Sequence, residues 1–319
     1  MRAWLLAGLL ALSTASASAE ECAISLYVLG VGQDAGAPQI GNPDDPAHKD
    51  PALALWPTSL ALVDHTAGKR YLIDATPEIT GQLQLLDTLA PTPGPGLGID
   101  GIFLTHAHIG HYAGLMYLGR EAAGTEDLPV YGMRRMREFL TENGPWAQLV
   151  ALGNIRLEKL ANLRPVALGD RLRVTPLQVP HRGEYAETVG FVIDSGQKSV
   201  LYVPDIDSWA EWRDKDQIDI VGLVRGQDRV IIDGTFFADG ELGKRDMSAV
   251  PHPRIRPTMD LLDVLPTRDR RKVYFTHLNH TNPVRFADSP ERAEVLERGY
   301  RIAERGETLC LADTARTGE

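Results

Sequence analysis

Residues 101–111 read GIFLTHAHIGH, an apolar strand-like run that passes directly into three closely spaced histidines. His106, His108 and His111 stand at positions i, i+2 and i+5, in a chain that contains nine histidines altogether. In an extended segment residues i and i+2 point to the same side, and a following turn brings the third ring round. Imidazole is the commonest protein ligand for metals such as zinc, and three rings leave one position open for water. The stretch therefore predicts a metal site carried at the end of a strand.

Further ligand-type side chains follow other apolar runs at the point where each run ends. His181 follows LQVP, Asp205 follows VLYVP and His277 follows VYFT. A rigid scaffold commonly presents its binding residues at the ends of neighbouring elements, so we expect these side chains to converge on the histidines of 101–111. The full set of such residues is Asp74, His181, Asp205, Asp233, His277 and His280.

Apolar runs rich in Val, Ile and Tyr alternate along the chain with longer amphipathic segments. The strands fall into an early and a late cluster, and each sheet must cover its second face. The pattern favours an α/β (α+β) fold of two packed sheets with helices outside. The predicted strands span 23–30, 59–64, 70–74, 101–105, 128–131, 171–179, 188–194, 199–203, 229–232, 272–276 and 307–312. The predicted helices span 79–89, 112–123, 133–143, 258–265 and 290–305.

Composition and the N-terminal segment bear on partners and location. The 319 residues carry 33 Lys and Arg against 43 Asp and Glu, a net charge of −10, which argues against a nucleic-acid partner.

Residues 1–19 combine a basic start, an apolar run and an A-x-A ending, which predicts a signal peptide cleaved after Ala19. That apolar run is shorter than the roughly 20 residues a membrane helix needs. We expect a periplasmic or secreted protein, with no stable membrane association after cleavage and a single domain over 20–319.

The chain has two cysteines, at opposite ends of the predicted domain. Cys22 opens the first predicted strand of the mature chain, and Cys310 lies in the last one. In an oxidising compartment, a disulfide between them would tie the two ends together. Two buried free thiols are the alternative, and the sequence leaves both possibilities open.

The ordered set Asp74, His106-x-His108-x-x-His111, His181, Asp205 and His277 resembles the motifs of the metallo-β-lactamase superfamily. The resemblance covers nearly the whole predicted domain and implies a four-layer αββα sandwich. Within that superfamily, several segments are similar to the PqqB family of pyrroloquinoline quinone (PQQ) biosynthesis. These segments are VLG at 28–30, GAPQ at 36–39, HIGHYAGL at 108–115, DGTF at 233–236 and HLNHTNP at 277–283.

The resemblance implies six metal ligands and one or two Zn²⁺ ions, with Fe²⁺ as an alternative. The ligands would be His106, His108 and His181 for one ion, His111 and His277 for a second, and Asp205 bridging the two.

The resemblance also implies roles for residues around the ligands. His280 and His252 would be reserve ligands or proton carriers in catalysis, and Asp74 and Asp233 would orient the imidazole rings. The superfamily has an aspartate directly before the third histidine, whereas this chain has Gly110. We expect this departure either to weaken the second metal site or to leave a single ion.

Three functions follow from this set of residues. The first is a metal-dependent hydrolase, in which hydroxide at the metal attacks a small ester, phosphodiester, lactone or lactam substrate. The second is a PqqB-like non-haem iron oxygenase, since His111, His277 and Asp205 form a set of two histidines and one carboxylate. The third is a non-catalytic metal- or ligand-binding protein. The two enzymatic alternatives expect a small-molecule substrate, and the sequence leaves the oligomeric state open.

Overall fold

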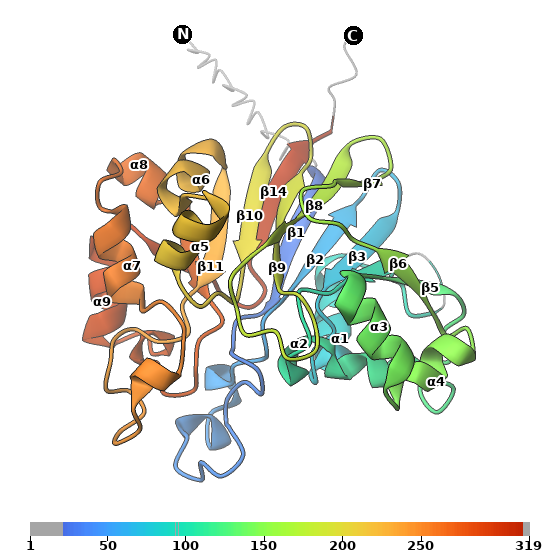
Figure 1. The fold of residues 1–319 in the computed structure, drawn as a ribbon, viewed down its shortest axis with the longest axis horizontal. Helices are drawn as coiled ribbons and strands as arrows, with labels where there is room; N and C mark the ends of the chain where they lie inside the picture. The colour runs from blue at the N-terminus through green and yellow to red at the C-terminus, as the bar shows by residue number, and fades with distance from the viewer. Residues whose placement is uncertain (1–21, 93, 95, 315–319) are drawn as a thin grey trace, which may run out of the picture.

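The computed structural model describes residues 22–92, 94 and 96–314, and the predicted signal peptide lies outside the described residues. Two seven-stranded sheets pack face to face, and helices cover the outer face of each (Figure 1). The predicted αββα sandwich is therefore confirmed. Among the described residues, no helix has both the length and the apolar character needed to cross a membrane.

The first sheet has the strand order β14-β1-β2-β3-β4-β5-β6. Its pairs are antiparallel from β14 to β3 and parallel from β3 to β6. The strands are β1 (Cys22–Gly30), β2 (Ser59–Asp64), β3 (Lys69–Ile73), β4 (Gly101–Phe103), β5 (Leu128–Gly132), β6 (Ile155–Lys159) and β14 (Thr308–Asp313).

The second sheet has the order β13-β12-β11-β10-β9-β8-β7. Its pairs are parallel from β13 to β10 and antiparallel from β10 to β7. The strands are β7 (Val166–Leu168), β8 (Leu172–Gln178), β9 (Val189–Asp194), β10 (Ser199–Val203), β11 (Arg229–Asp233), β12 (Val273–Thr276) and β13 (Arg301–Ile302).

The helices form two outer layers, one on each side of the paired sheets (Figure 1). On the first sheet lie α1 (Ile79–Leu89), α2 (Ile109–Tyr112), α3 (Arg134–Glu142) and α4 (Trp146–Ala151). On the second lie α5 (Trp209–Asp216), α6 (Ile220–Gly226), α7 (Ile255–Leu262), α8 (Thr267–Arg270) and α9 (Pro290–Glu297). Short 3₁₀ turns occur at η1 (Pro46–His48), η2 (Pro51–Leu53), η3 (Ala113–Leu118), η4 (Met247–Ala249) and η5 (Pro283–Arg285).

Apolar side chains fill the space between the two sheets. Phe103 of β4 stacks on Tyr131 of β5 with ring centroids 4.3 Å apart and meets Phe191 of β9 edge-on at 5.9 Å. Two further apolar clusters lie between each sheet and its own helices. Burial of apolar surface on both faces of each sheet thus holds the strand ends, and the side chains that follow them, in fixed positions.

Two predicted helices are shorter in the structure than the sequence suggests. The segment 112–123 is not one helix, because α2 passes into the 3₁₀ turn η3 where Gly114 packs closely on backbone: a Cβ there would lie 2.1 Å from the Thr76 carbonyl oxygen. Helix 290–305 ends at Glu297. Gly299 then adopts φ +89°, and the chain turns back as β13 beside β12.

The two cysteines form a disulfide, with their Cα atoms 5.7 Å apart. Cys22 lies on β1 and Cys310 on β14, which are antiparallel neighbours at the edge of the first sheet. Of the two alternatives that the sequence left open, the structure therefore contains the bridge.

Candidate metal centre

The ligand-type residues gather at one edge of the sandwich, each just past the end of a strand. The histidines of 106–111 follow β4, His181 follows β8, Asp205 follows β10 and His277 follows β12. Asp74 and His277 adopt φ of +66° and +62°, a conformation that non-glycine residues seldom take. Such backbone strain is common where the structure must aim a side chain into a functional site.

One group of donor atoms comprises His106, His108, His181 and Asp205, all within 4.8 Å of one another. The Nε2 atoms of His106 and His181 lie 2.8 and 3.1 Å from Nδ1 of His108. The Asp205 carboxylate is 3.4 Å from the His106 Nε2 atom and 3.5 Å from that of His181. Three imidazoles and one carboxylate thus converge on a single point.

Asp205 also faces a second group of donors. Its Oδ2 atom lies 3.3 Å from Nε2 of His111 and 3.2 Å from Nε2 of His277. The same two histidines form a further donor group with Asp34, within 4.8 Å. Asp205 therefore lies between two clusters, as a bridging carboxylate would.

Hydrogen bonds on the far side of the rings fix their orientation. Nδ1 of His111 donates to Asp74 at 2.7 Å, and Nδ1 of His181 donates to Asp207 at 2.6 Å. The Thr235 hydroxyl lies 2.9 Å from Nδ1 of His277. Because Nδ1 of these three rings is engaged in this way, their Nε2 atoms face the centre, the arrangement typical of metal-ligating histidines.

Several donor atoms at the centre are buried without a hydrogen-bond partner among the described residues. They are Nε2 of His111, Nε2 of His277 and Oδ1 of Asp205. An unpaired buried polar group costs about 1–3 kcal/mol, so three in one place call for a ligand that satisfies them together. A divalent cation does so, and imidazole nitrogen with carboxylate oxygen suits zinc and iron. The residues fit a metal cofactor.

The electrostatic environment also favours a cation. Burial lowers the pKa of His106 well below its usual value, and the neighbouring His111 lowers it further. Burial acts in the same direction on His111, but the charges of Asp74 and Asp205 and the hydrogen bond from Nδ1 to Asp74 outweigh it and raise the pKa of His111 to about 10. Burial opposes ionisation of Asp205, yet the surrounding histidines hold its pKa well below the usual range. Positive charge is therefore stabilised between the two carboxylates.

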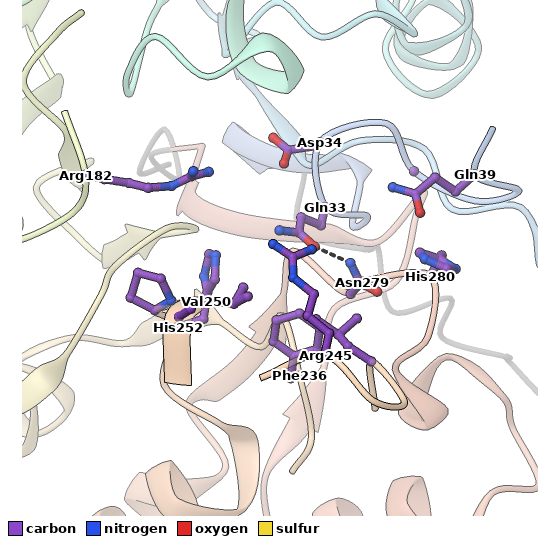
Figure 2. Close-up of a pocket in the computed structure, with 14 residues that line it drawn as sticks. Gln33, Asp34, Gln39, Arg182, Phe236, Arg245, Val250, His252, Asn279 and His280 are labelled. Atoms are coloured by element: carbon purple, nitrogen blue, oxygen red, sulfur yellow. Dashed lines mark hydrogen bonds between the residues drawn. The ribbon is translucent and has the colours of Figure 1, made fainter. Parts of the chain in front are cut away.

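A cavity of about 300 Å³ opens beside the centre (Figure 2). Asp34 and His252 belong both to its lining and to the donor groups. Arg182 and Arg245 reach it from the loops that follow β8 and β11. The remaining lining combines polar side chains with apolar ones: Gln33, Gln39, Asn279 and His280 are polar, and Phe236, Leu242 and Val250 are apolar.

The residues singled out from the sequence either lie at the centre, orient a ring of the centre or lie apart from it. The structure brings all six proposed ligands to the centre, namely His106, His108, His111, His181, Asp205 and His277. Asp74 accepts from Nδ1 of His111 at 2.7 Å and Asp233 accepts from Nδ1 of His252 at 2.8 Å, so each of these carboxylates orients an imidazole ring. His252 belongs to a donor group with Asp205, Asp233 and His277. His280 lines the cavity, where its Nδ1 atom lies 3.3 Å from Nδ2 of Asn42. It belongs to none of the donor groups found among the described residues.

Sequence reasoning did not single out four residues that lie close to the ligands. Asp207 holds His181, and the hydroxyls of Thr105 and Thr235 contact the rings of His106 and His277. Asp34 lies in a loop that the sequence marks only as polar and turn-rich. Asp207 stands two residues after Asp205 in the segment PDID, which is the one local signal that could have indicated it.

A model of the Beta-lactamase superfamily domain matches residues 69–278, more than half of the chain. The chain belongs to this superfamily, in agreement with the two-sheet fold and the histidine–aspartate centre.

Within the superfamily the chain is similar to proteins named for PQQ synthesis. It is 26% identical over 286 residues to coenzyme PQQ synthesis protein B of Pseudomonas putida, which covers 82% of this chain and 89% of that protein. The crystal structure of Zn²⁺-bound PqqB from Methylobacterium extorquens has the same fold, with a TM-score of 0.74 at 23% identity, covering 89% of this chain and 99% of that one. A diphosphatase of the PhnP family shares the fold with a TM-score of 0.62 at 22% identity, covering 90% and 96%.

Proposed function

We propose that this chain is a metal-dependent hydrolase that acts on a small anionic ester. The observation that carries the proposal is the position of Asp205 between two histidine clusters, beside a polar cavity lined by two arginines. Zinc is the metal we propose, because three imidazoles with one carboxylate form a donor set that zinc commonly takes.

The chain's own residues supply what the reaction needs around the metal. A divalent ion held by the histidines and Asp205 would lower the pKa of a bound water toward about 7 and polarise the scissile oxygen. Arg182 and Arg245 bind the negative charge of the substrate and orient it in the cavity. His252 lines the same cavity, is held by Asp233 and has a pKa of about 9: burial lowers this pKa, and the charge of Asp233 raises it. It is therefore placed to give a proton to the leaving group.

The experiment is a hydrolysis assay with a panel of anionic and neutral substrates. We expect the Zn²⁺-loaded protein to hydrolyse bis(4-nitrophenyl) phosphate better than 4-nitrophenyl acetate or a chromogenic β-lactam. The Arg182→Gln/Arg245→Gln variant should raise KM for the phosphodiester and leave the neutral ester unaffected. Arg268→Gln, an 86% exposed arginine on α8, serves as the control. Equal turnover before and after complete metal removal would contradict the proposal, and no turnover of any substrate would favour a non-catalytic binding protein.

The names of the relatives favour a second candidate, a role in PQQ synthesis, for which we propose oxygen chemistry at iron. His111, His277 and Asp205 supply the two histidines and one carboxylate that suit Fe²⁺. This candidate predicts iron in the purified protein and oxygen consumption with substrate. The hydrolase predicts zinc and turnover without oxygen, so elemental analysis combined with an oxygen electrode separates the two.

A further inference from the structure

Position 110 lies next to the second donor group and carries no side chain. A Cβ built on Gly110 would lie 2.4 Å from Cα of Asp34 and 2.7 Å from its carbonyl oxygen. Both contacts are to backbone, so no flexible side chain can move aside to make room. The backbone of residue 34 therefore fills the space that an aspartate at position 110 would need.

A carboxylate that position 110 lacks is present nearby, on Asp34. It lies within 4.8 Å of ring nitrogens of His111 and His277. The Nδ1 atoms of both rings face other partners, Asp74 and Thr235, while both Nε2 atoms are buried without a hydrogen-bond partner among the described residues. Two directed imidazoles and a nearby carboxylate are thus placed so that one divalent ion could bind all three.

The loop that carries Asp34 is held to the segment that carries His277. The Gln33 N–H donates to the Leu278 carbonyl at 2.9 Å, and the Leu278 N–H donates to the Val31 carbonyl at 2.7 Å. The side-chain amides of Gln33 and Asn279 are also hydrogen-bonded (Figure 2). These contacts fix the position of the Asp34 backbone relative to His277, so a ligand role does not require the loop to move.

A turn-capping role does not account for the Asp34 side chain. Asp45 and Asp50, in the same long connection, each accept a hydrogen bond from the backbone N–H two residues further on. In the described part of the chain, Asp34 makes no such bond, and the N–H of Gly36 instead donates to the Gln33 carbonyl. The Asp34 carboxylate is therefore available to coordinate a metal ion at the centre.

We propose that Asp34 is a ligand of a second divalent ion, together with His111, His277 and Asp205. The carboxylate comes from the loop after β1 and takes the place of one at position 110. Two imidazoles and two carboxylates complete a four-donor set for zinc or iron. The inference concerns metal binding and does not depend on which reaction the centre performs.

The test is the zinc stoichiometry and affinity of Asp34→Asn, an isosteric change that removes the charge. Protein stripped of metal is titrated with Zn²⁺ against a chromophoric chelator, and bound zinc is counted by elemental analysis. Wild type should bind two ions. Asp34→Asn should keep the ion of the His106, His108 and His181 group and bind the other at least about tenfold more weakly. Asp44→Asn, an exposed aspartate in the same connection, is the matched control.

Gly110→Ala provides an independent arm, because it removes no donor atom but pushes the Asp34 backbone away. It should weaken the same ion, and circular dichroism and the melting temperature of each variant would show whether the fold is intact. Two zinc ions bound with wild-type affinity by folded Asp34→Asn would overturn the proposal. Loss of both ions by a folded variant would also overturn it, since Asp34 is assigned to one site only.

Discussion

The Asp74 carboxylate lies 2.7 Å from Nδ1 of His111, and both side chains are completely buried. Asp74 also accepts hydrogen bonds from the backbone N–H and the hydroxyl of Thr105, at 2.8 and 2.9 Å. Its position directly after β3 and its φ of +66° aim it at the ring. A single carboxylate thus fixes the tautomer of one ligand and joins the histidine loop to the neighbouring strand.

Replacing Asp74 by asparagine should weaken metal binding at the second donor group. The amide oxygen still accepts from His111, but the negative charge that favours a cation is lost, so we expect zinc affinity to fall about 10- to 100-fold. Zinc titration of the stripped protein measures this. Asp170→Asn, an exposed aspartate, should titrate like wild type; an unchanged affinity in Asp74→Asn would show that the Asp74–His111 contact is only structural.

Much of the centre could be predicted from the sequence, because its main ligands follow apolar strands and keep an ordered motif. His106, His108 and His111 are local in the chain, so their spacing alone indicates a common site. Asp34 could not be predicted in this way, and Asp207 is indicated only by its place two residues after Asp205. The role of Asp34 depends on hydrogen bonds between the loop after β1 and the segment after β12, about 245 residues away in the sequence.

The fold shows a similar division. The long apolar strands lie where the sequence predicts them, whereas the short edge strands β6 and β7 were missed because their residues are partly exposed and weakly patterned. The predicted helix 290–305 combined α9 with β13, since the two residues of β13 become a strand only by pairing with β12. Whether these segments form strands depends on pairing with neighbouring strands, and a short stretch of sequence does not contain that information.

Removing the disulfide should destabilise the protein without changing its fold. The bridge joins β1 to β14 across 288 residues of sequence, and loss of such a bridge costs about 2–5 kcal/mol. Cys22→Ser/Cys310→Ser should therefore unfold at a lower denaturant concentration than wild type. Reductant should lower the wild-type midpoint and leave that of the double variant unchanged; an equal response of both proteins would contradict the prediction.

Glu241 should make stability depend on pH between about 4.5 and 7. Burial raises its pKa to about 7 from an ordinary value of 4.5, although backbone N–H groups of Phe237 and Ala238 oppose the shift. The folded state binds this proton more tightly than the unfolded state, so stability falls as pH rises through this window. Glu241→Gln should remove that part of the dependence in thermal unfolding, whereas Glu297→Gln, on the exposed end of α9, should not. Parallel pH profiles for Glu241→Gln and wild type would refute this.

Truncating Phe103 should destabilise the protein, because its side chain packs between the two sheets. Its ring is fully buried between Tyr131 and Phe191, and loss of such a side chain costs about 3–5 kcal/mol. Chemical denaturation of Phe103→Ala measures the loss. Ile40→Ala, at a side chain that is 98% exposed, should change stability by less than about 0.5 kcal/mol. A similar small change in both variants would mean that the sheets do not depend on this contact.

The most direct test of the centre is a count of zinc ions per chain in wild type and in Asp205→Asn after dialysis against Zn²⁺. Asp205 contacts both donor groups and its carboxylate is almost completely buried, so its charge contributes to both ions. We expect two ions per wild-type chain and weakened binding of both in the variant, with the fold retained. A wild-type chain that binds no zinc, or a variant that binds two ions as tightly as wild type, would contradict this expectation.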